Sequence, residues 1–157
     1  MLKNYKIFSQ KIDNHLDKFT NRFKSKVKNM IEYSLNGGKR LRSVIPLVIN
    51  QKLNPKIDIS KFAMSIELFH TCSLIIDDMP CMDNDKLRRN QLTIHHKYGE
   101  CKAQILVSLL LKEANNLIFE NINQLKVNKK SNLNNEQLDN ISIYLFQCIS
   151  DNLGLLG

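Results

Sequence analysis

The chain has 157 residues, 43% of them apolar, and a formal net charge of +8. This length and composition suit one compact domain that buries roughly 70% of the surface exposed by the unfolded chain. No run approaches the ~18 uninterrupted apolar residues of a membrane span, and the opening residues, MLKNYKIFSQK, lack the apolar centre of a secretion signal. We therefore expect a cytoplasmic protein with no membrane span.

Charge and cysteine spacing exclude further classes. A positive charge attracts nucleic acid, acidic lipid or a phosphorylated small molecule, but the lysines here are scattered, with little aromatic interleaving and no recognition-helix pattern. No nucleic-acid partner is expected. The cysteines show neither CxxC pairs nor regular spacing, which favours isolated thiols over a disulfide framework or a zinc site; they are Cys72, Cys81, Cys101 and Cys148.

The first part of the chain predicts helices with clear breaks between them. Apolar residues recur with a 3.6-residue rhythm over 5–31, which predicts one long helix or two in tandem. The glycine pair at 37–38 ends this stretch. Residues 41–53 are predicted to form a short buried helix, in which Pro46 is either tolerated near the first turn or introduces a kink. The next break is at 54–55.

The second part predicts three more elements. The strongest helix pattern covers 59–79, and a polar loop is expected over 80–98. A further helix is predicted from about Glu100 to Ile122, followed by an exposed connection rich in Asn and Lys. Asn134 is expected to cap a last helix, with Gln137 three residues later. Because no strand pattern of useful length appears, the fold class is all-α.

The segment DDMPCMDNDKLRR carries the chemistry. Asp77, Asp78 and Asp83 offer hard oxygen ligands for Mg²⁺, which joins a few carboxylates to substrate phosphates. Arg88 and Arg89 supply planar guanidinium groups that bind phosphate oxygens in pairs. The combination predicts a polyanionic substrate held partly through metal and partly through arginine, and diphosphate fits this description.

Alternatives to this interpretation exist. Runs of Asp, Asn, Lys and Arg usually form solvated loops, but these aspartates begin where the apolar run FAMSIELFHTCSLII stops. An EF-hand is rejected because its glycine and final glutamate are missing. Spacing places His70 and Asp77 on one helix face, so His70 is either a core residue or a ligand-binding group. Asp77 and Asp83 meet at one metal only if the helix ends between them, and Pro80 favours such an end.

These features together resemble the trans-isoprenyl diphosphate synthases, the family that includes farnesyl and geranylgeranyl diphosphate synthases. The match runs from about residue 30 to the end of the chain and consists of GGKRLR at 37–42, ELFHTCSLIIDDMPCMDNDKLRR at 67–89, then Thr93, His95 and YGE at 98–100. The resemblance implies a Mg²⁺-dependent enzyme that condenses isopentenyl diphosphate with an allylic diphosphate to give farnesyl or geranylgeranyl diphosphate. Residues 1–157 are then the N-terminal portion of one isoprenoid synthase helical bundle.

The resemblance also implies roles for single residues. The three aspartates match the first aspartate-rich motif, which holds Mg²⁺ against the allylic diphosphate, and Arg88 matches an arginine that contacts the same group. The positions that bind isopentenyl diphosphate match Lys39, Arg42, His70 and Arg89. Chain length in the family is limited just before the motif, where this sequence has small residues, Cys72 and Ser73, so a product longer than farnesyl is possible.

The sequence departs from the family pattern in several places. Asn90 and Leu92 replace the expected glycine and proline, and Val107 and Ser108 replace a glycine and an aspartate. The chain ends where the family continues into a second half with a second aspartate-rich motif. We expect either a truncated enzyme domain that works as a homodimer or with a complementary C-terminal half, or a non-catalytic relic or interaction subunit.

Overall fold

The computed structural model describes residues 2–53, 56–128 and 133–152. Its helices are α1 (Leu2–Thr20), α2 (Ser25–Leu35), α3 (Leu41–Leu53), α4 (Ser60–Asp77), α5 (Ile94–Tyr98), α6 (Glu100–Asn128) and α7 (Asn135–Asn152). Two short strands, β1 (Leu87–Arg88) and β2 (Gln91–Leu92), pair in antiparallel fashion with Leu87 opposite Leu92. The predicted all-α fold class is confirmed.

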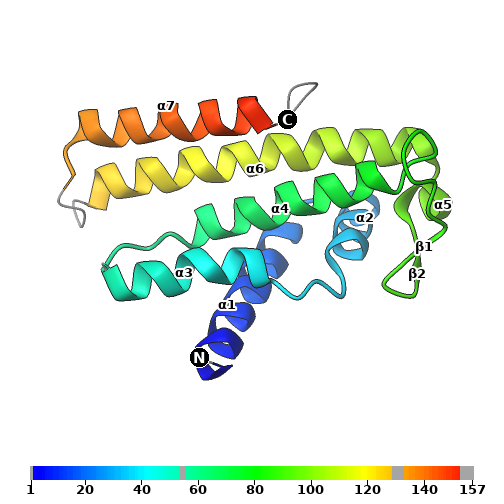
Figure 1. The fold of residues 1–157 in the computed structure, drawn as a ribbon, viewed down its shortest axis with the longest axis horizontal. Helices are drawn as coiled ribbons and strands as arrows, with labels where there is room; N and C mark the ends of the chain where they lie inside the picture. The colour runs from blue at the N-terminus through cyan, green and yellow to red at the C-terminus, as the bar shows by residue number, and fades with distance from the viewer. Residues whose placement is uncertain (1, 54–55, 129–132, 153–157) are drawn as a thin grey trace.

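Four helices lie side by side in the order α3, α4, α6 and α7 (Figure 1). Helix α1 crosses α3 and α4 and contacts both. The β1–β2 hairpin and α5 lie together near the C-terminal end of α4 and the start of α6 (Figure 1). One end of the bundle therefore gathers the residues that follow α4.

The core lies mainly between α4 and α6. Buried apolar residues recur at three- and four-residue spacing on both helices, as expected for facing helical stripes; they are Ala63, Met64, Leu68, Cys72 and Ile75 from α4, and Ala103, Leu106, Leu110, Ala114 and Leu117 from α6. Small alanine side chains let the two backbones approach closely. Because α4 is held by α6 on one side and by α1 and α3 on others, core packing sets the position of its last turn.

One of the two alternatives predicted for the first part of the chain is confirmed, and one later helix boundary differs from the prediction. The rhythm over 5–31 belongs to two tandem helices, α1 and α2, with a break between Thr20 and Ser25. The helix predicted to end near Ile122 continues to Asn128, because α7 packs against this part of α6 and Lys126 pairs with Asp139. The polar connection is therefore shorter than predicted, and its centre lies outside the described residues.

The region after α4 is more ordered than the predicted polar loop. It contains the β1–β2 hairpin and α5, and strands of two residues are too short to produce a detectable alternation. Helix α3 forms as predicted, with Pro46 inside it, but it is only half-buried: Val44 and Leu47 are buried, whereas Ile45 and Ile49 are exposed. The break predicted at 54–55 lies outside the described residues.

The predicted cap of the last helix is confirmed. The Gln137 N–H donates to Asn134 Oδ1 at 2.8 Å, and the Asn134 N–H donates to Gln137 Oε1 at 2.9 Å. This reciprocal pair satisfies two backbone donors at the start of α7. In the part of the chain that the structure describes, no helix has the length and apolar character needed to cross a membrane. All four cysteines are free thiols, as predicted.

Asn121 connects α6 to the start of α4 through side-chain hydrogen bonds. Its Oδ1 accepts from the Phe62 N–H at 2.8 Å, its Nδ2 donates to the Asp58 carbonyl at 2.9 Å, and the residue is only 3% exposed. We expect Asn121→Ala to lower the free energy of unfolding by about 2 kcal/mol, because the Phe62 N–H and the Asp58 carbonyl, both in part-buried hydrogen bonds, lose their partner. Urea denaturation measures this loss. Asn123→Ala, at an exposed position of the same helix, serves as the control and should change stability by less than about 0.5 kcal/mol.

Candidate functional site

The aspartate-rich segment begins where α4 ends. Helix α4 stops at Asp77, and the chain folds back so that the Asp83 N–H donates to the Asp77 carbonyl at 2.9 Å. The Met82 and Asn84 N–H groups both donate to the Met79 carbonyl, at 2.9 and 3.1 Å. The helix thus ends between Asp77 and Asp83, which is the condition for these two residues to approach each other. Backbone hydrogen bonds hold the turn that follows.

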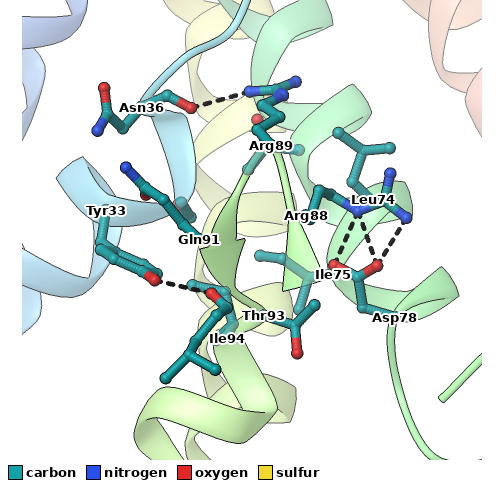
Figure 2. A pocket seen from close by; sticks show the side chains of 13 residues that line it. Tyr33, Asn36, Leu74, Ile75, Asp78, Arg88, Arg89, Gln91, Thr93 and Ile94 are labelled. Atoms are coloured by element: carbon teal, nitrogen blue, oxygen red, sulfur yellow. Dashed lines mark hydrogen bonds and ion pairs between the residues drawn. The ribbon is translucent and has the colours of Figure 1, made fainter. Parts of the chain in front are cut away.

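Asp78 and Arg88 form the strongest ion pair of this region. Arg88 Nε donates to both carboxylate oxygens of Asp78, at 2.7 and 2.9 Å, and an Nη2 contact of 2.6 Å completes the pair (Figure 2). The Asp78 side chain is 5% exposed and that of Arg88 is 32% exposed. Hydrogen bonding to Asp78 raises the pKa of Arg88. In this conformation the guanidinium predicted to bind diphosphate is held by an aspartate of the neighbouring motif.

A tight hairpin points the two arginines in different directions. Arg88 lies over Asp78, whereas Arg89 Nη1 donates to the Asn36 carbonyl at 2.9 Å, in the loop after α2 (Figure 2). The Tyr33 hydroxyl donates to the Leu92 carbonyl at 2.7 Å and ties β2 to α2. The hairpin therefore connects the end of α4 to the segment that carries the glycine pair.

The hairpin turn explains one departure from the family pattern. Its two central residues, Arg89 and Asn90, have φ of 51° and 61°, as in a type I′ turn, where both φ values are positive. Glycine adopts such values most easily, and asparagine is among the few other residues that tolerate them. Asn90 is thus a chemically sensible replacement for the glycine expected at this position.

This turn predicts a contrast between two substitutions. We expect Asn90→Val to lower the free energy of unfolding by about 1–2 kcal/mol, because a β-branched residue is strained at positive φ. Asn90→Gly should leave stability unchanged or raise it by a few tenths of a kcal/mol. Thermal unfolding of the two variants measures the difference. Equal stabilities would show that this backbone conformation is not maintained in solution.

Several of the predicted phosphate-binding side chains gather around His70. Arg42, in the first turn of α3, lies with its Nη1 3.2 Å from His70 Nε2, and because arginine only donates, Nε2 accepts and the ring is neutral. Burial, followed by the Arg42 charge, lowers the pKa of His70, with smaller contributions from Arg89 and Arg88. Lys39 is exposed in the loop before α3. His70, predicted to be either a core residue or a binding group, is half-exposed among cations.

The lowered pKa of His70 gives a pH dependence. The unfolded chain, with an ordinary histidine pKa near 6.5, binds a proton more readily than the folded chain, so stability is highest above this value and falls as the pH drops through the lower, folded-state pKa. We expect His70→Gln to flatten the fall in unfolding free energy between about pH 7.5 and pH 5. Urea denaturation at several pH values measures this slope. The variant should retain part of this pH dependence, because the pKa of His15 is also lowered.

A buried ion pair that the sequence analysis missed holds the glycine-rich loop. Arg40 Nη1 donates to Glu67 Oε1 at 2.9 Å, its Nε donates to Asp13 at 2.8 Å, and the Ser43 hydroxyl donates to Glu67 Oε2 at 2.7 Å. Glu67 is 3% exposed. The sequence does indicate such a pair, because a glutamate buried within an apolar helix needs a cationic partner. The sequence prediction named the cations on either side of Arg40 and left this arginine out.

Comparison with known proteins decides the family. The sequence model described as polyprenyl synthetase matches residues 24–147. This chain belongs to the polyprenyl synthetase family. The resemblance found in the motifs is thus confirmed.

Relatives and solved structures agree with this membership. The chain is 34% identical over 134 residues to a trans-prenyltransferase of African swine fever virus, covering 80% of this chain and 42% of the viral protein. It is 38% identical over 130 residues to a farnesyl diphosphate synthase of Bacillus subtilis, covering 80% and 44%. A crystal structure of an FPP/GFPP synthase from Zymomonas mobilis superposes with a TM-score of 0.72 and 25% identity, covering 100% of this chain and 55% of that one. The chain therefore spans less than half the length of these two curated relatives.

The aspartates of this chain do not form a closed metal site. Among the described residues, no group of three His, Cys, Asp or Glu side chains is arranged to hold a metal ion. Asp78 is occupied by Arg88, whereas Asp77 is half-exposed and Asp83 is exposed. Mg²⁺ characteristically binds one or two carboxylates and completes its shell with substrate phosphates and waters. Asp77 and Asp83 fit an ion that arrives with a diphosphate, and the three-aspartate metal site stays a prediction.

The two residues assigned to chain length lie in different surroundings. Cys72 is buried, with its Sγ 3.7 Å from the Val107 carbonyl on α6, and burial raises the pKa of its thiol to about 12. Ser73 is exposed, and its hydroxyl donates to the His70 carbonyl at 2.9 Å. Their role in product length stays a prediction.

The arginine hairpin encloses only a small cavity. This cavity has a volume of about 40 Å³ and is lined by Tyr33, Thr71, Ile75, Asp78, Arg88 and Thr93, among other residues (Figure 2). Such a space holds only a few water molecules. This cavity is therefore too small to hold a diphosphate group.

Proposed function

We propose that this chain supplies the diphosphate-binding part of a Mg²⁺-dependent trans-prenyltransferase, which condenses isopentenyl diphosphate with an allylic diphosphate. The observation that carries this proposal is the meeting of the aspartate turn, the arginine hairpin and the glycine-rich loop at the end of α4, in a chain of the polyprenyl synthetase family. Anionic ligands for a metal and cationic groups for phosphate oxygens then face the same substrate.

Each substrate has its own set of residues in this proposal. Asp77, Asp78 and Asp83 hold Mg²⁺ with the allylic diphosphate, and Arg88 binds the phosphate oxygens of the same group. Isopentenyl diphosphate binds at the second set of cationic residues, Lys39, Arg42, His70 and Arg89. The contacts of Arg42 with His70 and of Arg89 with the Asn36 carbonyl support this division, because both place cationic groups beside the loop after α2.

Asp78 and Arg88 exchange partners when the substrate binds. In the structure each neutralises the other across 2.6–2.9 Å. On separation, the Asp78 carboxylate would pair with a metal cation and the Arg88 guanidinium with phosphate oxygens, so both charges would stay compensated. The bound Mg²⁺ supplies Lewis-acid stabilisation of the leaving diphosphate. Arg88 adds hydrogen bonds to the charge that develops there.

The hydrocarbon part of the substrate needs an apolar surface. A groove of about 290 Å³ lies between α4 and α7, next to α6, and its apolar lining supports binding of a prenyl chain; it includes Phe62, Ile66, Phe69, Leu145 and Ile149. Phe69 lies two helical turns before the aspartates on α4. We propose farnesyl or geranylgeranyl diphosphate as the product, with Phe69 as well as Cys72 and Ser73 influencing its length.

A complementary half is part of the proposal. The chain spans 42% and 44% of two curated relatives, so these residues match less than half of those proteins. We propose that turnover needs this C-terminal part in addition to the 157 residues of this chain, and that the assembled enzyme is a homodimer. Loss of one charge-stabilising group commonly costs about 3 kcal/mol, or ~100-fold in rate, and the other half supplies several such groups by family resemblance.

Incorporation of labelled isopentenyl diphosphate into prenyl product tests the proposal. We expect no product from the 157-residue chain alone and measurable product when the C-terminal half of a relative is added. Calorimetry should detect Mg²⁺-dependent binding of inorganic diphosphate to the chain alone, weakened in Asp77→Asn and unaffected in Asp139→Asn, which lies on α7. Diphosphate binding without turnover in the complemented mixture favours the non-catalytic interaction subunit, and absence of both sinks the proposal.

A further inference from the structure

Thr93 closes the base of the arginine hairpin. Its N–H donates to the Lys86 carbonyl at 3.1 Å, and its hydroxyl donates to the Asp85 carbonyl at 2.8 Å. The residue is 2% exposed. Both bonds join the start of α5 to the segment immediately before β1, at the base of the hairpin that carries Arg88 and Arg89.

The hydroxyl of Thr93 also determines the state of a buried histidine. His95 Nδ1 lies 3.2 Å from Thr93 Oγ1. A hydroxyl has one proton, and here it is directed to the Asp85 carbonyl, which only accepts. Thr93 Oγ1 is therefore an acceptor toward His95, and Nδ1 has to carry the proton. With the proton on Nε2 instead, two lone pairs would face each other across this contact.

The other ring nitrogen of His95 has no partner. His95 is 8% exposed. Among the described residues, its Nε2 is the one buried side-chain nitrogen or oxygen atom that has no hydrogen-bond partner. An acceptor left unpaired in this way costs free energy, and an unpaired Nε2–H donor would cost as much while also losing the Thr93 contact. Of the two tautomers, the Nδ1–H form thus satisfies more of the groups around the ring.

The connection continues from Asp85 to the aspartate motif. The Asp85 carboxylate lies 3.9 Å from Arg88 Nη2, and Arg88 is paired with Asp78. We propose that His95, held as the Nδ1–H tautomer, is a positioning residue that acts through Thr93 and Asp85 to orient Arg88. Its effect on ligand binding rests on the proposed function, because that function makes Arg88 a diphosphate-binding group. The tautomer itself is independent of any ligand.

Nitrogen-15 NMR of the ligand-free chain tests the tautomer directly. We expect His95 at neutral pH to show a protonated-type resonance for Nδ1 and an unprotonated-type resonance for Nε2. Thr93→Ser keeps a hydroxyl and should preserve this pattern. Thr93→Val removes the acceptor and should move the proton to Nε2. An Nε2–H tautomer in the unmodified chain, or an unchanged pattern in Thr93→Val, overturns the proposal whether or not the protein binds diphosphate.

Two substitutions of His95 test the positioning role. In His95→Asn the side-chain amide nitrogen lies close to the position of the former Nδ1, whereas in His95→Gln it lies close to that of the former Nε2. Loss of one hydrogen bond corresponds to roughly 3- to 10-fold in an equilibrium constant. Titration with inorganic diphosphate and MgCl₂ should therefore give weaker binding by this factor in His95→Gln and near-normal binding in His95→Asn.

The outcomes separate this proposal from the function on which it rests. If His95→Gln and His95→Asn weaken diphosphate binding equally and have equal melting temperatures, the result contradicts a role through Nδ1. If the unmodified chain binds no diphosphate, the proposed function fails, and the Nε–H resonance of Arg88 becomes the readout. That resonance should then shift in His95→Gln and Thr93→Val but not in His95→Asn or Thr93→Ser. Its constancy in all four variants overturns the positioning role.

Discussion

Replacing Arg88 with glutamine is expected to lower the free energy of unfolding by about 3 kcal/mol. The substitution leaves the Asp78 carboxylate, 5% exposed, without the three short contacts that compensate its charge. Breaking a buried ion pair by removing one partner typically costs about 3–5 kcal/mol, and the partial exposure of Arg88 favours the lower end. For a chain of this size the melting temperature should fall by roughly 6–12 °C. Urea and thermal denaturation measure both quantities.

The neighbouring arginine supplies a matched control. Arg89→Gln removes the same charge, but the Arg89 guanidinium is exposed and donates to one backbone carbonyl, so the expected loss is below about 1 kcal/mol. Asp78→Asn combined with Arg88→Gln should cost less than Arg88→Gln alone, because no unpaired carboxylate remains buried. Equal losses in Arg88→Gln and Arg89→Gln would mean that the Asp78 pair is not formed in solution.

Arg40→Met is expected to destabilise the fold by about 3–4 kcal/mol, as for other buried ion pairs that lose one partner. Methionine retains much of the apolar stem but removes the guanidinium that pairs with Glu67, a residue with 3% exposure in the middle of α4. The carboxylate keeps only the Ser43 hydroxyl as a side-chain donor, which does not compensate a full buried charge. The free energy of unfolding from urea denaturation is the relevant measurement.

Lys39→Met is the control for this prediction. It removes one positive charge from the adjacent, exposed position and should change stability by no more than about 0.5 kcal/mol. Glu67→Gln in the Arg40→Met background should restore part of the lost stability, because the buried charge is then gone. If Arg40→Met is as stable as Lys39→Met, Glu67 must be neutral or solvated in the folded protein.

Both ion pairs connect stability to the proposed substrate site. Arg40 holds the loop that carries Lys39 against α4, and Arg88 holds the hairpin that carries Arg89 against the end of the same helix. These two arginines therefore attach the flanking residues that are proposed to bind phosphate to helix α4. The geometry of the candidate site follows from charges that are compensated within the chain.

Local sequence was sufficient for the parts of this protein that depend on neighbours in the chain. The amphipathic rhythm located the longer helices but not α5, the apolar run of α4 identified the central one, and Asn134 and Gln137 marked the start of α7. The spacing of the aspartates and arginines identified the polyprenyl synthetase family, confirmed by the match over 24–147. These signals are short-range, because helix periodicity and capping act over three or four residues.

Only the tertiary structure decided how the charged groups pair. Asp78 meets Arg88 and Glu67 meets Arg40 because a hairpin and a loop fold back onto α4, and the partners in the second pair are 27 residues apart. The length of α6 was likewise decided by α7 packing against its final turns. Such partners are chosen by burial, since an unpaired charge is costly only where packing has removed the water.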